Sequence, residues 1–371
     1  MDSSRVVPAI IIVGILVICG LIGTVLVNVN DQQETGDPLY AVSVNYDDDI
    51  IGCTGTGDYS EGSSVILKAT PIAGDVIYGW FDKDGNKVSS EETYSITDLK
   101  EDVQLYVISI DEFDGDRTFH TPSNYVDGHE IWTITNVYTR KVVAVLEGAD
   151  VEYTFEEPGY YQGVMKNDTQ TFTQSYRING EVKRLFVWEY GTSDYGVIWS
   201  TTFEKYEEIY NSKSIEERRL TTNENTTGFV TYTDDDIVDL TSFLERKSIG
   251  MTQQQRANFV LDFVQKIEYI ADETTTGYTE YWKLPYETLF DKCGDCEDTS
   301  ILYASIMKAM GYDVALMIFP GHMAVGIGLE NGTGVKNRYD GVDYYYCETT
   351  SEGWEVGEKP DKYTDVKMVV I

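Results

Sequence analysis

The sequence predicts an α+β protein with an N-terminal transmembrane helix, two small β-rich modules and a C-terminal α+β domain. Three observations lead to this fold class. Residues 6–27 form one uncharged apolar run. Short alternating runs rich in Tyr, Thr and Val then extend to about residue 190, and such residues favour strands. Beyond residue 252, helical spacing of apolar positions comes first and short strands follow, the order typical of an α+β domain.

The composition describes a folded and strongly acidic protein. Of its 371 residues, 42% are hydrophobic and 13% aromatic, which is enough for packed cores in two or three domains. There are 63 acidic and 28 basic residues, and the formal net charge is -35. Such a surface repels phosphate groups, so we expect no nucleic-acid partner. A solvated acidic surface explains the charge better than cation binding or attraction of basic substrates.

The apolar run at residues 6–27 has the length of a membrane-spanning helix. Arg5 precedes it, and the only charges in the linker at residues 28–38 are acidic. The positive-inside rule therefore places the tail, residues 1–5, in the cytoplasm and the rest of the chain outside. A cleaved signal peptide is the alternative, although no A-x-A-like site follows. The predicted location is the cell membrane, crossed once.

Residues 39–110 are predicted to form a small β-module of short strands and turns. The turn Asp82–Lys87, DKDGNK, carries an Asp-Gly pair that signals a hairpin. The ligand spacing of a calcium loop does not fit it. From Gly55 to Ile108, the turn placement and the "GW" strand resemble an internalin-type B-repeat. That resemblance implies an extracellular spacer or adhesive unit without catalysis.

Residues 111–190 are predicted to form a second β-rich module. Its alternating runs and the motif EEPGYY resemble a small immunoglobulin-like or PKD-like sandwich. His120 and His129 lie near its start. We expect both to be surface or packing residues, because no matching His or Cys set is nearby.

Residues 191–371 are predicted to form the C-terminal domain, with its core at 252–360. Apolar positions repeat with helical spacing from Thr252, the expected N-cap, to Ile270. A second helix follows Asp295 and is closed by Gly311. Strands are then expected at three places: Val314–Phe319, His322–Leu329 and Val342–Thr349.

The stretch DKCGDCEDTS places Cys293 and Cys296 at CxxC spacing before the second helix. We expect Asp295 to cap this helix and Asp298 to complete a box-like pair. Cys296 is then the first helical residue, where free N–H groups and the helix dipole favour a thiolate. The adjacent acids, including Glu297, raise the thiol pKa, and a nearby histidinium would offset them.

His322 begins a Gly-flanked strand, and Glu348 follows in the strand after it. Nucleophile, base and orienting carboxylate therefore occur in the order Cys, His, acid. Two alternatives compete: a buried structural Cys296, and a zinc site made by Cys293, Cys296, His322 and Cys347. A redox CxxC is disfavoured because no thioredoxin-like βαβ pattern precedes it.

The span from Thr252 to Pro360 resembles the transglutaminase-like, papain-fold superfamily through GDCEDTSILYASIMKAMGYDV, GHMAVGI and CETTSEGW. This resemblance implies that Cys296 is the nucleophile, His322 the base and acid, and Glu348 the orienting group. The family most often has Asp at the third position, so Glu348 is a departure. An oxyanion hole would use the Cys296 N–H and a second donor. Tyr281 and Trp282 are candidates for that donor or for the pocket by their position upstream.

The resemblance implies a membrane-anchored extracytoplasmic enzyme whose thiol forms a thioester with a protein or peptide substrate, cell-envelope components included. Hydrolysis is favoured over cross-linking transfer to an amine. The alternative is a catalytically inert cell-surface adhesin or envelope-binding protein. We expect no cofactor and no metal. If Cys296 is the nucleophile, a disulfide between Cys293 and Cys347 would brace the site and leave Cys53 unpaired.

Overall fold

The structure is a computed structural model that describes residues 38–112, 117–121, 131–148, 151–166, 171–219 and 226–371. The predicted tail and transmembrane helix lie outside the described residues, as does His129. Among the residues that are described, no helix combines the length and apolar character that a membrane span requires.

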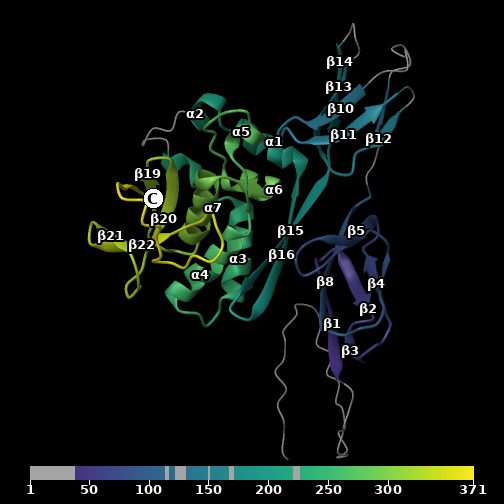
Figure 1. Cartoon of the computed structure of the whole chain (residues 1–371), viewed down its shortest axis with the longest axis horizontal. Coiled ribbons are helices and arrows are strands. Elements are labelled where there is room, and N and C mark those ends of the chain that lie inside the picture. Colours follow the sequence, from purple (N-terminus) through teal and green to yellow (C-terminus); the bar gives the residue numbers. More distant parts are fainter. Residues whose placement is uncertain (1–37, 113–116, 122–130, 149–150, 167–170, 220–225) are drawn as a thin grey trace, which may run out of the picture. The chain divides into compact units, whose positions relative to one another are not determined.

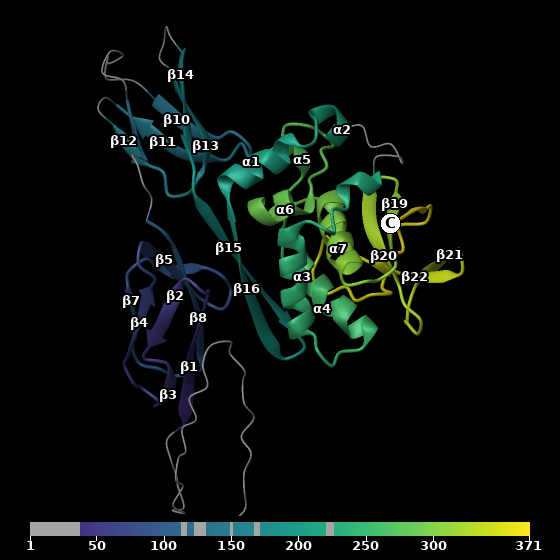
Figure 2. The same ribbon diagram turned by 180° about the vertical axis from the view of Figure 1, so that it is seen from behind.

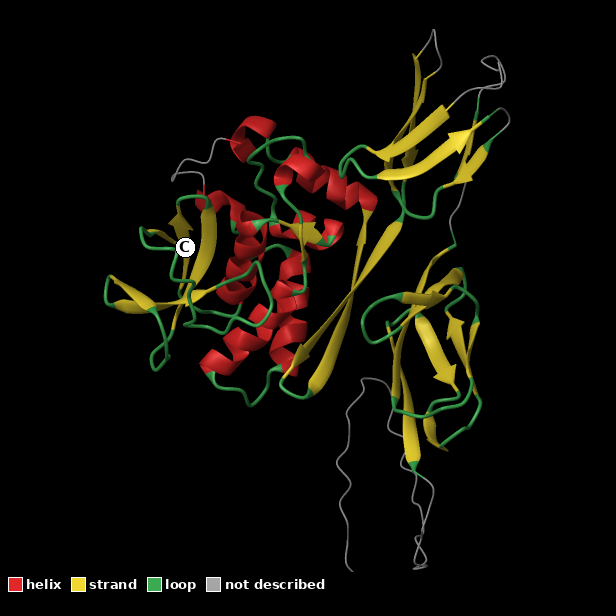
Figure 3. Cartoon of the chain, viewed as in Figure 1, coloured by secondary structure: helices red, strands yellow, loops and turns green. Residues whose placement is uncertain are grey.

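The predicted α+β class is wrong for the chain as a whole, which is mostly β, with 43% strand and 22% helix. Every helix of the described residues lies between Phe203 and Ala309, and the helices gather in one region of the chain (Figure 3). Strands occur on both sides of that segment. The sequence prediction gave weight to two strongly periodic helices, while many short strands, each with a weak local signal, make up most of the regular structure.

The first β-rich part contains two sheets. One has the order β3-β1-β8-β5-β6, and the other has the order β2-β4-β7. β1 and β8 pair in parallel, and the hairpin predicted at Asp82–Lys87 is confirmed by the antiparallel pairing of β5 with β6. The two sheets share a core around Trp80 and Leu67. The strands are β1 Leu39–Tyr46, β2 Ile50–Thr54, β3 Gly57–Ser60, β4 Val65–Pro71, β5 Asp75–Phe81, β6 Lys87–Ser89, β7 Thr93–Ile96 and β8 Val103–Asp111.

The second β-rich part has a four-stranded sheet, β11-β10-β13-β14, and a two-stranded sheet, β12-β9. Phe119 packs edge-on against Trp132, with ring centroids 5.1 Å apart, and joins the sheets in one core. His120 is exposed and lies 3.1 Å from Glu152, so its predicted surface position is confirmed. The strands are β9 Thr118–His120, β10 Ile131–Asn136, β11 Val142–Glu147, β12 Glu152–Thr154, β13 Gly159–Lys166 and β14 Thr171–Ile178.

A long antiparallel hairpin, β15 Glu181–Tyr190 and β16 Ser193–Thr202, leads into the helical region. The boundary predicted at residues 190 and 191 falls at its turn. Thr252 caps the predicted helix through a capping box with Gln255, which confirms that expectation. The helices are α1 Phe203–Asn211, α2 Ile215–Arg219, the 3-10 turn η1 Thr226–Phe229, α3 Asp235–Lys247, α4 Gln253–Gln265, α5 Asp272–Thr275, α6 Pro285–Asp291 and α7 Cys296–Ala309.

Helix α7 is the centre of the C-terminal region. It contacts α3, α4 and α6 and also β19 and β20 of the last sheet (Figure 1). The view from behind shows the same helices beside the hairpin β15–β16 (Figure 2). Gly311 follows the helix with φ +84°, as predicted for its closing residue.

The last sheet has the order β21-β22-β20-β19-β23. Its strand at Val314–Phe319 has the predicted bounds, and the other two expected strands are confirmed to within two residues at their ends. The sheet packs on buried α7, so elements that lie far apart in the sequence meet near the start of this helix. The remaining strands are β17 Glu268–Tyr269, β18 Cys293–Gly294, β19 Val314–Phe319, β20 His322–Gly328, β21 Lys336–Tyr339, β22 Val342–Cys347 and β23 Lys367–Val370.

Candidate active site

Cys296 is the first residue of α7, as predicted. Asp295 occupies the N-cap position, but its side chain makes no capping hydrogen bond, so the predicted box with Asp298 is wrong. The Asp298 carboxylate instead accepts a hydrogen bond from the backbone N–H of Lys283 at 2.7 Å. Because Asp298 binds the Lys283 backbone, its side chain does not complete a capping box with Asp295.

The Cys296 thiol is buried and has two close polar neighbours. Its Sγ donates to Glu297 Oε2 at 2.9 Å, and it accepts a hydrogen bond from the backbone N–H of Met323. Burial, followed by the charge of Glu297, raises the thiol pKa well above its usual range. Burial and then Asp295 raise the pKa of Glu297 to about 10. At neutral pH the resting sulfur is therefore a protonated thiol.

His322 and Glu348 are joined directly. The two residues come from the start of β20 and from the position after β22, and His322 Nε2 lies 3.0 Å from Glu348 Oε2. Both side chains are buried. Because the strands β20 and β22 pair antiparallel, the end of one lies beside the start of the other. The structure thus brings the predicted base and the predicted orienting acid together.

Four hydrogen bonds hold the Glu348 carboxylate. Oε2 also accepts from the Tyr346 hydroxyl at 2.8 Å, and Oε1 accepts from the Thr350 N–H at 3.2 Å and the Thr350 hydroxyl at 2.7 Å. Burial raises the pKa of this carboxyl, but the bonds from His322, Thr350 and Tyr346 outweigh burial and lower it to about 2. The group is therefore ionised and only accepts, so Nε2 of His322 carries the ring proton.

An aromatic ring also packs against the face of the His322 imidazole. The ring of Tyr363 stacks on it with centroids 4.2 Å apart and planes 7° apart. Gln265 of α4 donates to the backbone carbonyl of Glu348 at 2.8 Å. Sequence reasoning missed these neighbours. The alternation of β22 could have found Tyr346, since it is two residues before Glu348 and on the same face, whereas Tyr363 and Gln265 carry no local signal.

Within the described residues, no hydrogen bond joins the Cys296 thiol to the ring of His322. The sulfur instead contacts the backbone of Met323, the residue next to His322. The structure therefore places the thiol against the start of β20 and pairs His322 with Glu348. It does not form a continuous Cys, His and acid chain of hydrogen bonds.

Tyr281 and Trp282 are both buried. Trp282 belongs to the same hydrophobic core as Cys296, and its Nε1 has no hydrogen-bond partner among the described residues. Tyr281 stacks on Tyr278 with centroids 5.9 Å apart, and its backbone N–H donates to Asp272. Both predicted candidates therefore keep a buried side-chain donor without a hydrogen-bond partner among the described residues: Nε1 of Trp282 and the hydroxyl of Tyr281.

The other cysteines do not form the predicted bridge. Cys293 and Cys347 are buried and free, as is Cys296, and the half-exposed Cys53 is also free. Cys293 lies beside Lys283, with Nζ 3.9 Å from its Sγ, while Cys347 contacts Tyr303 of α7. The two sulfurs therefore have different neighbours, and a disulfide between them is excluded in this structure.

The predicted zinc set does not converge in the described part of the chain. Two other groups there could hold an ion: Asp295 with Cys296 and Glu297, and Asp272 with Asp295 and Asp298. Both consist mainly of carboxylates, the donors that hard cations such as Ca²⁺ and Mg²⁺ prefer.

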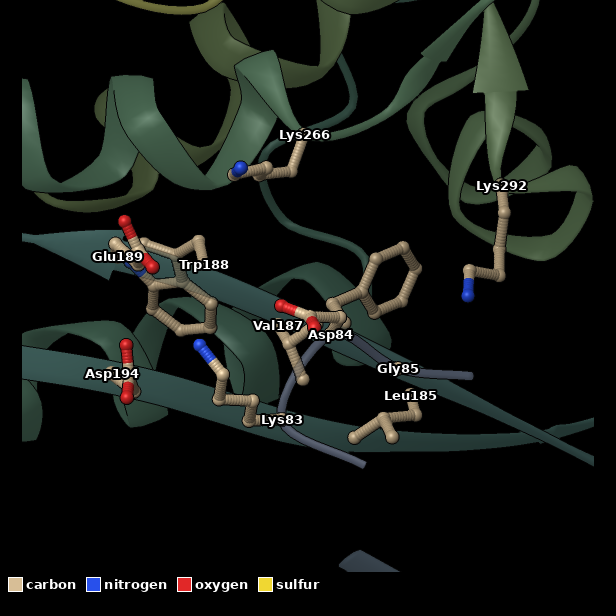
Figure 4. A pocket seen from close by; sticks show the side chains of 11 residues that line it. Lys83, Asp84, Gly85, Leu185, Val187, Trp188, Glu189, Asp194, Lys266 and Lys292 are labelled. Carbon is tan, nitrogen blue, oxygen red and sulfur yellow. The ribbon is translucent and has the colours of Figure 1, made fainter. Parts of the chain in front are cut away.

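A separate pocket lies along β15 (Figure 4). Trp188 and Glu189 of that strand line it together with Lys83, Lys266 and Lys292. None of the predicted catalytic residues lines this pocket.

No family model and no curated protein matches the chain. Solved structures that are similar to it include a proposed cysteine protease from Cytophaga hutchinsonii, 10% identical, covering 63% of this chain and 78% of that one with a TM-score of 0.24. Another is a proposed protease from Parabacteroides distasonis, 11% identical, covering 87% and 71% with a TM-score of 0.23. At this distance neither likeness bears on the function of the chain.

Proposed function

We propose that the chain is a thiol enzyme that acts on peptide or amide bonds, with Cys296 as nucleophile, His322 as base and Glu348 as the orienting carboxylate. The observation that supports this most is the 3.0 Å hydrogen bond between His322 Nε2 and an ionised Glu348. That bond fixes the tautomer and leaves Nδ1 as the ring nitrogen able to accept a proton. The thiol accepts a hydrogen bond from the amide of Met323, the residue next to His322, and the proposal requires a rotation of the Cys296 side chain that turns the sulfur toward Nδ1.

In the reaction, the thiol proton passes to Nδ1 of His322 as the sulfur attacks the amide carbonyl carbon. A C–S bond forms, and the carbonyl oxygen becomes an oxyanion, which in this proposal accepts hydrogen bonds from the Cys296 N–H and from Trp282 Nε1. When the tetrahedral intermediate collapses, the C–N bond breaks and the imidazolium protonates the leaving amine. Water then cleaves the thioester, giving the acid and restoring the thiol. We favour water over an amine as acceptor, following the sequence resemblance.

Glu297 is the group that competes with this chemistry. It holds the thiol at 2.9 Å, and this contact has to be given up before the proton can move to His322. We expect substrate binding to favour the change of partner from Glu297 to His322, because a bound amide excludes water from the site around the sulfur.

The first experiment measures alkylation of each cysteine in the full chain by iodoacetamide, with peptide mass spectrometry as the readout. We expect Cys296, 8% exposed, to react faster than Cys293, which is 7% exposed and is the matched comparison, and faster than the fully buried Cys347. His322→Asn should slow that reaction at least ~10-fold, since general-base assistance contributes factors of this order or more. The matched control is His120→Asn, the same substitution at a surface histidine, which should leave the rate unchanged.

An equal Cys296 rate in the wild type and in His322→Asn would contradict the proposal and favour a catalytically inert module. A peptide library, incubated with and without a primary amine, then separates the reactions. New carboxyl termini that are absent with Cys296→Ser indicate hydrolysis, whereas amine adducts indicate transfer.

A further inference from the structure

Three buried aspartates meet at the start of α7. Asp272 is the first residue of α5, Asp295 is the N-cap of α7 and Asp298 lies in its first turn. One ligand atom from each lies within 4.8 Å of the other two. The residues are only 2%, 8% and 0% exposed. Water therefore does not solvate these carboxylates from outside.

Each of the three carboxylates is fixed through a hydrogen bond that it accepts. The backbone N–H of Tyr281 donates to Asp272, and that of Lys283 donates to Asp298. Asp295 shares a hydrogen bond with the Glu297 carboxyl group. These bonds set the orientation of the carboxylates without any cation.

Each carboxylate also keeps a second oxygen that is buried and has no hydrogen-bond partner. These are Oδ1 of Asp272, Oδ1 of Asp295 and Oδ2 of Asp298. A buried polar atom without a partner is costly, and native proteins satisfy nearly all such atoms with protein, water or an ion. Three such oxygens in one small cluster indicate a missing positively charged partner.

Lys283 provides only part of that charge. Its Nζ lies 4.0 Å from Asp298 Oδ2, too far for a hydrogen bond, and is closer to Asp291, at 3.2 Å, and to the carbonyl oxygen of Cys293, at 3.1 Å. Its two shortest contacts are therefore with groups outside the three aspartates.

We propose that Asp272, Asp295 and Asp298 bind one hard divalent cation, Ca²⁺ or Mg²⁺. The set offers only oxygen ligands, which both ions prefer over softer metals. Gly294 allows the close approach of the chain to Asp298, because a Cβ there would lie 2.5 Å from Cβ of Asp298. The ion would tie α5 and the segment at Tyr281 and Lys283 to the start of α7. This structural role is independent of the proposed catalysis, and the sequence by itself predicts no metal.

Binding is measured on the full chain after chelation with EDTA and dialysis into 150 mM KCl. Equilibrium dialysis against CaCl₂ and, separately, MgCl₂ gives the stoichiometry, with metal content read by mass spectrometry. We expect one saturable site in the wild type that is lost in Asp298→Asn. Asp239→Asn, which removes an exposed carboxylate from α3, is the matched control and should retain the site. The salt suppresses loose binding to the acidic surface.

Thermal unfolding provides a second readout that does not depend on a single variant. Saturating ion should raise the Tm of the wild type by several degrees. Asp295→Asn should raise the Tm of the ion-free protein, since it relieves repulsion, and should abolish the ion-dependent increase. The absence of saturable binding of either ion, or binding that persists in both Asp298→Asn and Asp295→Asn, would overturn the proposal.

Discussion

The substitution Glu348→Gln tests the electrostatics of the site without assuming any activity. Glutamine has the shape of glutamate but no charge, and its NH₂ group faces donors in place of an acceptor oxygen. In the wild type the carboxyl pKa falls from 4.5 to about 2 despite burial, because His322, Thr350 and Tyr346 donate to the carboxylate. The ionised form is therefore the one that the fold stabilises.

The expected loss of stability follows from the difference between the unfolded and folded pKa of Glu348. Each tenfold change in proton affinity corresponds to ~1.4 kcal/mol, so ionised Glu348 contributes on the order of 3 kcal/mol to the free energy of unfolding at neutral pH. Because the folded pKa is the lower one, the contribution is complete above about pH 4.5, the unfolded value, and is lost as the pH falls to about 2. The loss of hydrogen bonds in the variant adds a smaller cost at every pH.

The assay is urea unfolding of the wild type and of Glu348→Gln, followed by tryptophan fluorescence at pH 7, 5, 4 and 3. We expect the difference in unfolding free energy between them to shrink steadily below pH 5. Glu352→Gln removes an exposed carboxylate paired with Lys266 and serves as the control, with an expected change below ~0.5 kcal/mol. A difference that stays constant from pH 7 to pH 3 would refute the assignment of an ionised, hydrogen-bonded carboxylate.

Two further predictions concern the supports of the site. Gly294→Ala should destabilise the chain by about 1–3 kcal/mol, because the new methyl group overlaps Asp298. The control is Gly52→Ala, where a Cβ meets nothing within 4 Å. Equal urea midpoints for the two variants would contradict the predicted overlap. Arg218→Leu should cost about 3–5 kcal/mol, because it leaves buried Glu287, now 2.7 Å from the guanidinium, without its partner. Adding Glu287→Gln should restore part of the loss, and a double variant no more stable than the single one would argue against that pair as the cause.

The sequence determined the local features of the site. Helix starts depend on capping and spacing within a few residues, so the Thr252 capping box and Cys296 at the first position of α7 could be read directly. Strand bounds near His322 followed from short apolar runs between Gly and Pro. The capping box predicted for Asp295 and Asp298, which is wrong, shows the limit, because the backbone N–H of Lys283, fifteen residues upstream, donates to the Asp298 carboxylate instead.

The balance of strand and helix was beyond local reasoning. Short strands are stabilised by their partners across a sheet, and pairs such as β1 with β8 join residues about sixty positions apart. Single-sequence patterns record periodicity but not pairing, so the weight of strand structure was underestimated.

Local sequence thus identified the residues of the proposed site: a cysteine at a helix start, one histidine on a strand and an acid after the next strand. Only the tertiary structure decided their partners: Glu348 with His322, Tyr363 over the imidazole, Glu297 on the thiol, and Asp272 beside Asp295 and Asp298. The physical reason is the distance along the sequence over which each interaction acts. Capping and periodicity act over a few residues, whereas these contacts exist because burial of apolar surface packs α5, α7 and the last sheet together.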